Sequence, residues 1–196
     1  CKFFVFCNSL WFWLHVGACS LFFEMLGVEQ YVKLSAVDHV LSRPQTYVGS
    51  TELHDTRMFV FDGNGKMQNR RVSFPPALYK IFDEILMNAV DARQRDPTVN
   101  TIRVNINPTD NEISVYNNGK GITTVKHLTE GVHIPELIFG HLRTLSNYND
   151  AEEKLTAGRN GFGAKLANIF SHKFVVEIAD TVERSLYHQE WYDNMK

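Results

Sequence analysis

The stretch IFDEILMNAVDARQRD, residues 81–96, decides the fold of this chain. Apolar residues recur through it at helical spacing, which predicts a helix over residues 76–94. Glu84, Asn88 and Asp91 are spaced i, i+4 and i+7, so they lie within about 60° of one another on that helix. Taken alone, this stripe is the polar face of an amphipathic helix. A carboxylate and an amide stacked in this way can also bind a water molecule and a hydrated Mg²⁺.

A second block, SVYNNGKGI at residues 114–122, follows a predicted hairpin and runs from a strand into a glycine-hinged turn. Gly119 and Gly121 let the backbone approach a flat ligand closely. Asn117 offers both a donor and an acceptor, as recognition of an adenine edge requires. In isolation the block is an ordinary Asn-Gly turn, so its weight comes from the blocks around it.

The third block, TAGRNGFGAKLANIF at residues 156–170, is a glycine-rich loop that opens a helix. It does not fit the Walker pattern, because no Ser or Thr follows Lys165, and no strand precedes it as a dinucleotide fingerprint requires. Backbone N–H groups freed by glycines still favour phosphate, and the lysine adds a positive charge. The predicted phosphate-binding residues are Gly158, Arg159, Asn160, Gly161, Phe162, Gly163, Ala164 and Lys165.

Together the three blocks predict a nucleotide-hydrolysing site. Their order and spelling resemble the ATPase domain of eukaryotic-type DNA topoisomerase II, within the GHKL (Bergerat-fold) ATPases. Further similarity runs through residues 37–51, 57–86, 132–150 and 188–196, so that the resemblance covers about residues 28–196. It implies an α+β fold, a Bergerat (GHKL) sandwich with a mixed β-sheet and helices on one face, truncated before the transducer domain. ATP would lie in the layer between the sheet and these helices.

The resemblance also implies roles for individual residues. Glu84 corresponds to the general base that activates water, Asn88 to the Mg²⁺ ligand, and Asn117 to the nucleoside contact. Tyr31 stands where the family's N-terminal arm carries a tyrosine that reaches into the partner protomer's site. The other residues expected at the nucleotide come from the helix, the glycine turn, the lid and the phosphate loop: Asp91, Gly119, Gly121, Ser146, Asn147 and residues 158–165.

Three positions depart from the family's pattern. Ala92 replaces an asparagine near the nucleotide, Leu145 replaces a serine of the lid, and Ala157 replaces a glycine ahead of the phosphate loop. Each change removes a polar contact or some loop freedom, and none removes the base or the metal ligand. We therefore expect an effect on nucleotide affinity more than on reaction type. A non-catalytic remnant, or another GHKL clamp of the chaperone or repair type, is the alternative.

The function implied is that of the ATP-binding and hydrolysing N-gate portion of a type II DNA topoisomerase, which passes one DNA duplex through another. The implied cofactors are ATP and Mg²⁺. The implied partners are DNA, through the full-length enzyme, and a second copy in a homodimer; the implied compartment is the nucleus. The family's transducer domain supplies a lysine to the γ-phosphate, and residues 1–196 do not include it. We therefore expect this chain to bind ATP weakly and to hydrolyse it slowly.

The amino-acid composition says less about function than the three blocks do. The 196 residues carry a net charge of −2, which argues against a main DNA-gripping surface. Residues 1–27 form an apolar, aromatic leader that we expect to lie outside the fold, and no membrane partner is expected. Residues 28–56 are assigned to an N-terminal arm and first helix, and residues 57–196 to the ATP-binding domain. Expected helices span 35–42, 76–94, 134–142 and 163–171; expected strands span 57–61, 68–73, 101–107, 112–116, 173–179 and 185–192.

Overall fold

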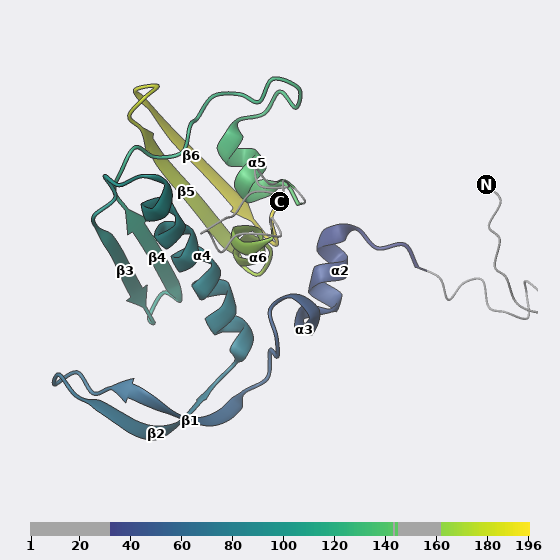
Figure 1. Ribbon diagram of the computed structural model, residues 1–196. Coiled ribbons are helices and arrows are strands. Elements are labelled where there is room, and N and C mark those ends of the chain that lie inside the picture. The colour runs from purple at the N-terminus through teal and green to yellow at the C-terminus, as the bar shows by residue number, and fades with distance from the viewer. Residues whose placement is uncertain (1–31, 143, 145–161) are drawn as a thin grey trace, which may run out of the picture. The chain divides into compact units, whose positions relative to one another are not determined.

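The computed structural model describes residues 32–142, 144 and 162–196. Backbone contacts divide the chain into two units, Cys1–Leu34 and Ser35–Lys196, and the second unit holds every element considered below. Its helices and strands are shown in Figure 1. In the ranges that the structure describes, no helix is both long and apolar enough to cross a membrane.

The predicted helices are confirmed to within a few residues. They are α2 (Ala36–Ser42), α4 (Pro76–Arg95), α5 (Ile134–Gly140) and α6 (Gly163–Ile169). Ser35 caps α2, because its hydroxyl accepts the backbone N–H of Asp38 at 3.1 Å. A further single turn, α3 (Pro44–Tyr47), was not predicted. Proline favours the start of such a turn, but four residues are too few to show helical periodicity.

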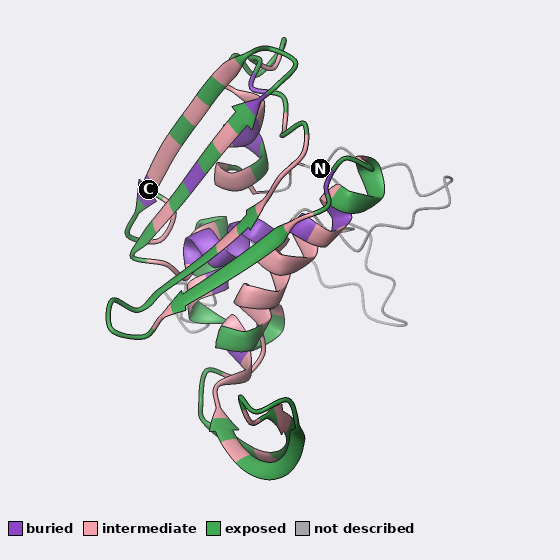
Figure 2. Cartoon of the chain, turned by 90° about the vertical axis from the view of Figure 1, so that its left-hand side faces the viewer, coloured by how far each residue is buried: buried purple, intermediate pink, exposed green. Residues whose placement is uncertain are grey.

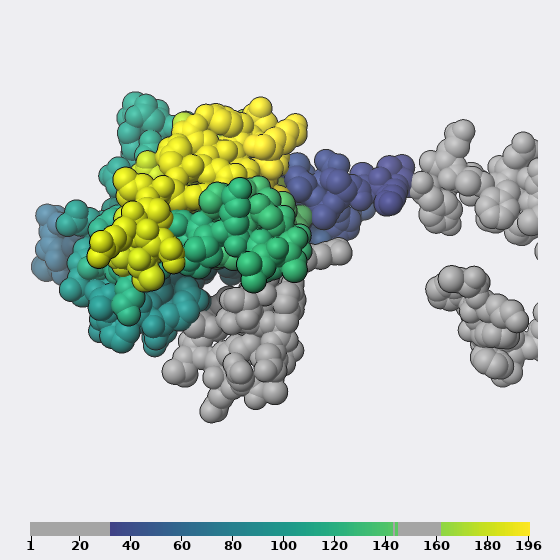
Figure 3. All heavy atoms as spheres, turned by 90° about the horizontal axis from the view of Figure 1, so that it is seen from above, coloured from purple at the N-terminus to yellow at the C-terminus, as the bar shows by residue number. Residues whose placement is uncertain are grey.

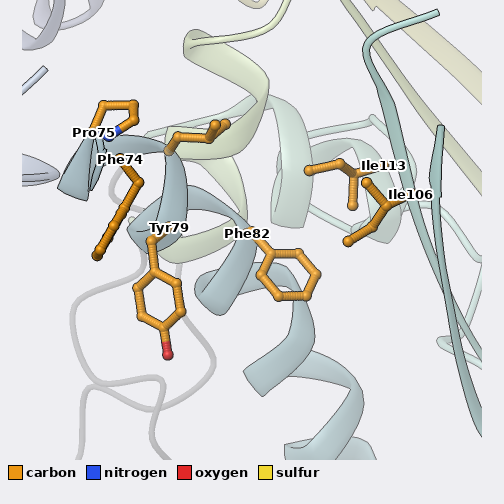
Figure 4. A pocket seen from close by; sticks show the side chains of 7 residues that line it. Phe74, Pro75, Tyr79, Phe82, Ile106 and Ile113 are labelled. Carbon is orange, nitrogen blue, oxygen red and sulfur yellow. The ribbon is translucent and has the colours of Figure 1, made fainter. Parts of the chain in front are cut away.

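Helix α4 is confirmed, but its first turn is less buried than its apolar pattern predicts. Ala89 is buried, whereas Leu78, which the periodicity places on the same apolar stripe, is 51% exposed. Leu78 instead lines an open apolar depression of about 260 Å³. Figure 4 shows this depression between the start of the helix and the hairpin of β3 (Ile102–Asn107) and β4 (Glu112–Asn117), with Phe82 and Ile113 among the side chains around it. The Leu78 side of the first turn therefore faces a surface hollow, whereas the neighbouring Ala77 is buried in the core.

The predicted strands are also confirmed, and they pair as three antiparallel hairpins. Their bounds are β1 (His54–Phe61), β2 (Met67–Phe74), β3 (Ile102–Asn107), β4 (Glu112–Asn117), β5 (Lys173–Asp180) and β6 (Ser185–Tyr192). The fold class is borne out by the structural neighbours given below. The mixed sheet that the resemblance implies is not formed by these six described strands, because each strand pairs only with its antiparallel hairpin partner and three separate two-stranded sheets result.

The β3–β4 and β5–β6 hairpins lie side by side, with α4 and α6 on one face (Figures 1 and 2). Helix α4 packs on β4, and α6 packs on β5. The backbone N–H of Thr181 donates to the carbonyl of Lys120 at 3.2 Å, which joins the end of one hairpin to the end of the other. Figure 3 shows the C-terminal hairpin against the green segment that contains α5, where Phe139 and Phe174 are in ring contact.

The main apolar cluster lies around α6, which is buried along its whole length after Gly163. Its members come from three helices and the residue after α3: Val40, Val48, Ala77, Leu166 and Ile169. Burial of these side chains fixes α6 against α4, and the two helices form the most extensive packing outside the hairpins. The start of α6, where the glycine-rich block ends, is thereby held beside the helix that carries Glu84.

Candidate nucleotide site

The structure brings the first and third sequence blocks together at one point. A Cβ added to Gly163, the first residue of α6, would overlap Oε2 of Glu84 on α4. The carboxylate therefore lies directly against the backbone at the end of the glycine-rich block. Only a residue without a side chain permits this approach. Of the glycine-rich block, Gly163 is thus in direct proximity to this acid.

The other oxygen of Glu84 is held by its own helix. Lys80, one turn earlier, donates to Glu84 Oε1 at 2.6 Å. This hydrogen bond is the main cause of a raised pKa for Lys80, so that the lysine stays charged. The Glu84 side chain is 25% exposed. One carboxylate oxygen is thus fixed by a cation, while the second lies against Gly163.

Asn88 and Asp91 continue the stripe toward the C-terminal end of α4. Asn88 is half-buried, and Asp91 is buried with 4% of its surface exposed. No three His, Cys, Asp or Glu side chains gather as a metal cage within the described ranges. Asn88, the predicted Mg²⁺ ligand, offers an amide oxygen, a donor of the type that Mg²⁺ prefers. Ala92, which departs from the pattern that the resemblance implies, is also half-buried on this helix.

Lys165 is the charged group of the third block, and it is only 3% exposed. Its Nζ donates to the carbonyl oxygen of Thr144 at 2.7 Å, within residues 132–150, which the resemblance assigns to the lid segment. Burial lowers the pKa of Lys165 to about 8. Phe162 packs on the core cluster and Ala164 is buried, so their side chains face inward. Contacts from these two residues to a phosphate would therefore come from the backbone.

The second block forms the predicted turn, and protein contacts lock it on both sides. Gly119 has φ +122°, and a Cβ there would overlap Val99. Gly121 has φ +80°, and a Cβ there would lie 2.5 Å from the carbonyl oxygen of Ala179 on β5. Asn117 donates through Nδ2 to the carbonyl of Asn118 at 3.0 Å. The glycines are thus required by close packing within the protein, a reason that sequence reasoning did not give.

Two residues of this turn region were not singled out from the sequence. Asn118 Oδ1 accepts the backbone N–H groups of Asn100 and Thr101, at 3.0 and 2.9 Å. Asp96 Oδ2 accepts the backbone N–H of Lys120 at 2.8 Å. Asn and Asp commonly make such bonds to nearby backbone, but these bonds join residues 17 to 24 positions apart. No local pattern in the sequence identifies such a partner.

Several predicted site residues lie outside the residues that the structure describes. They are Tyr31, Ser146, Asn147, Gly158, Arg159, Asn160 and Gly161, together with the departing positions Leu145 and Ala157. Their roles stay predictions. Within the described residues, the structure brings Glu84 and Gly163 together at one end of the site. The turn around Asn117 is formed separately, at the end of β4.

Comparison with known proteins agrees with this arrangement. Residues 74–185 match the family described as histidine kinase-, DNA gyrase B-, and HSP90-like ATPase. The chain is 53% identical over 173 residues to human DNA topoisomerase 2-alpha, and 54% identical over 175 residues to the Caenorhabditis elegans DNA topoisomerase 2 top-2. Each alignment covers 88% of this chain, which spans only 11% and 12% of those relatives.

A solved structure supports the same assignment. The fold superposes on the ATPase region of Saccharomyces cerevisiae topoisomerase II with a TM-score of 0.84 and 46% identity, covering 87% of this chain and 45% of that one. The predicted resemblance to the topoisomerase II ATPase domain is thereby confirmed. Since the family match takes in more than half of the residues and includes the acid-bearing helix, the glycine turn and the start of α6, the chain belongs to the histidine kinase-, DNA gyrase B- and HSP90-like ATPases.

Proposed function

We propose that this chain binds Mg²⁺-ATP between α4 and the glycine-rich block, and that it is the ATP-hydrolysing gate portion of a type II DNA topoisomerase. One observation carries the proposal: the Glu84 carboxylate lies against the backbone of Gly163, at the first residue of α6. A base must lie within hydrogen-bond reach of the water that attacks a phosphate. A glycine next to that base lets the carboxylate approach the backbone of the phosphate-binding block, with no side chain between them.

In this proposal the two oxygens of Glu84 have different tasks. Oε1 is fixed by Lys80 at 2.6 Å, which orients the carboxylate without a contribution from the ligand. Oε2 faces Gly163 and accepts the proton of the attacking water. Lys165 supplies positive charge from beneath the block, since a transferring phosphoryl group gathers negative charge that a positioned cation stabilises.

Mg²⁺ would be held by Asn88, one helical turn beyond Glu84, and when bound it supplies charge neutralisation for the phosphates. Asp91, Asn117, Gly119 and Gly121 would meet the rest of the nucleotide. The fit rests on the half-buried amide of Asn88, on the same helix as the base. We extend the proposal to the loop residues Gly158 to Gly161 and to the lid residues Ser146 and Asn147 from the resemblance alone.

For the longer protein we propose the partners of the topoisomerase relatives. ATP binding would close two copies into a homodimer, with Tyr31 near the partner's site, and the closed dimer would act on DNA in the nucleus. These statements rest on the identity of about half of the aligned residues with DNA topoisomerase 2. That identity also favours this proposal over a chaperone-type or repair-type clamp.

The test separates binding from chemistry. Labelled ATP is titrated into the 196-residue chain with Mg²⁺, and hydrolysis is followed under single-turnover conditions with the chain in excess. We expect Glu84→Gln to bind ATP as the parent does and to lose about 10²-fold or more in rate. Asn88→Ala should lose the Mg²⁺ dependence of ATP affinity.

Asp83→Asn is the matched control, because it removes a carboxylate about 100° around α4 from Glu84 and also adjacent to Lys80. It should retain the parental rate. A parent chain that binds no ATP would support the non-catalytic remnant instead. A Glu84→Gln rate equal to that of Asp83→Asn would show that Glu84 is not the base.

A further inference from the structure

The turn at Asn117–Gly121 is fixed by a carboxylate that belongs to a different element. Asp96 directly follows α4 as its C-cap residue. Its Oδ2 accepts the backbone N–H of Lys120 at 2.8 Å. A Cβ on Gly119 would lie 2.9 Å from the same oxygen, so the turn passes directly over this carboxylate. Asp96 therefore connects the end of the acid-bearing helix to the centre of the predicted nucleoside turn.

The carboxylate is itself held in place. Its Oδ1 accepts the backbone N–H of Thr98 at 3.0 Å and the hydroxyl of Thr98 at 2.7 Å. Both oxygens therefore have partners with defined directions, and charge-assisted bonds of this kind are stronger than neutral ones. These bonds, with the Lys120 N–H first among them, lower the pKa of Asp96 to about 2. The group is ionised throughout the physiological range.

A second set of hydrogen bonds connects the segment after α4 to the same turn. Asn118 Oδ1 accepts the N–H groups of Asn100 and Thr101, and its Nδ2 donates to Asn100 Oδ1 at 2.9 Å. The segment after α4 is thus hydrogen-bonded to the turn at Asn118 and at Lys120, while β5 contacts the turn at Gly121. The hydrogen bonds of Asn118 order the end of the strand. The hydrogen bond of Asp96 fixes the turn relative to α4.

We propose that Asp96 is a positioning residue that sets the placement of the Asn117–Gly121 turn relative to Glu84 and Asn88, and so controls recognition of the nucleoside end of the nucleotide. The inference rests on the proposed function, because it assigns a task to the nucleoside half of that site. Asp96 does not touch the nucleotide in this account. It acts through the Lys120 backbone, and loss of its carboxylate leaves the phosphate half of the site unchanged.

The test uses two ligands that divide the site. ATP engages both halves, whereas inorganic tripolyphosphate engages only the phosphate half. Their dissociation constants are measured for the parent chain, Asp96→Ala and Asp96→Asn. We expect Asp96→Ala to weaken ATP binding by about tenfold while tripolyphosphate binding stays within about twofold. Asp96→Asn retains an acceptor oxygen and should restore most of the ATP affinity.

Asp62→Ala is the matched control, since Asp62 makes the same kind of bonds in the β1–β2 turn, to the N–H groups of Asn64 and Lys66. It should change neither ligand's affinity. Thr98→Val serves as a milder variant that keeps the Asp96 carboxylate and removes one of its supports, and it should show a smaller loss for ATP alone. Amide exchange of Lys120 in the ligand-free chain should rise in Asp96→Ala and not in Asp62→Ala.

The outcomes distinguish this inference from the function on which it rests. A parent that binds neither ligand overturns the proposed function, and the inference with it. A parent that binds both ligands, with equal losses for ATP and tripolyphosphate in Asp96→Ala, shows general destabilisation and overturns the positioning role alone. Unchanged ATP affinity in Asp96→Ala and Thr98→Val overturns it as well.

Discussion

The glycine turn at Gly121 and the helix start at Gly163 both require a residue without a side chain, but for different physical reasons. Around Gly121 the obstructing atom is the backbone carbonyl of Ala179, and the local φ of +80° already disfavours other residues. At Gly163 the obstructing atom is the outer oxygen of the flexible Glu84 side chain. The first glycine therefore serves the fold, and the second serves the position of a candidate base.

The largest expected effect tests the structural half of this comparison. Gly121→Ala should cost about 2–5 kcal/mol of unfolding free energy, from the left-handed backbone and from overpacking against a carbonyl. Gly65→Ala is the matched control, because Gly65 has φ +84° but no atom within 4 Å of an added Cβ. It should cost only about 1–2 kcal/mol. Urea denaturation measures both, and equal costs would contradict the steric role of Ala179.

The second prediction concerns Gly163. Gly163→Ala should leave the stability of the chain nearly unchanged, because the Glu84 side chain can rotate away. The displaced carboxylate should reduce single-turnover ATP hydrolysis by about 10²-fold, as misplacement of a catalytic group by about 1 Å does. A melting temperature measured beside the rate separates the two effects. A loss of stability as large as that of Gly121→Ala would remove the distinction between the two glycines.

A smaller effect is expected from the charge beneath the phosphate block. The pKa of Lys165 is lowered to about 8 by burial, so that the free chain loses this charge as pH rises through that value. If bound phosphate requires the charged form, tripolyphosphate affinity of the parent should fall about tenfold by pH 9, where about one molecule in ten remains protonated. Lys165→Arg stays charged over this window, and its affinity should fall less. Parallel pH profiles for the two proteins would exclude Lys165 as the relevant group.

The smallest effect concerns the other half of the site. The folded-state pKa of Asp96 is about 2, below the ordinary value of 3.8, so its bonds add stability above about pH 4 that is lost as pH falls toward 2. Asp96→Asn cannot ionise, so the stability difference between parent and variant should shrink over this acid range. Urea midpoints at several pH values measure the difference. A constant difference from pH 5 to pH 2 would contradict an ionised Asp96 bond to Lys120.

The regions differ in how much of their structure could be predicted from the sequence. The helix carrying Glu84 and the six strands followed from periodicity and alternation, because both signals are local. The exposure of Leu78 did not follow, since periodicity places a side chain on a stripe without stating what covers that stripe. Asp96 was missed for a similar reason: its partner Lys120 lies 24 positions away, and no spacing rule links them.

By itself, the sequence determined the described helices and strands other than the short α3, the three blocks and the family. Residue type and spacing specify local backbone conformation and the chemistry that each block can perform. Only the tertiary structure decided which groups meet: Glu84 with Gly163, Lys165 with Thr144, and Asp96 with Lys120. Burial of α6 against α4 produces the first of these contacts, and the hairpin arrangement produces the last. The physical reason is that packing is a long-range property, in which apolar burial brings together residues that the chain keeps far apart.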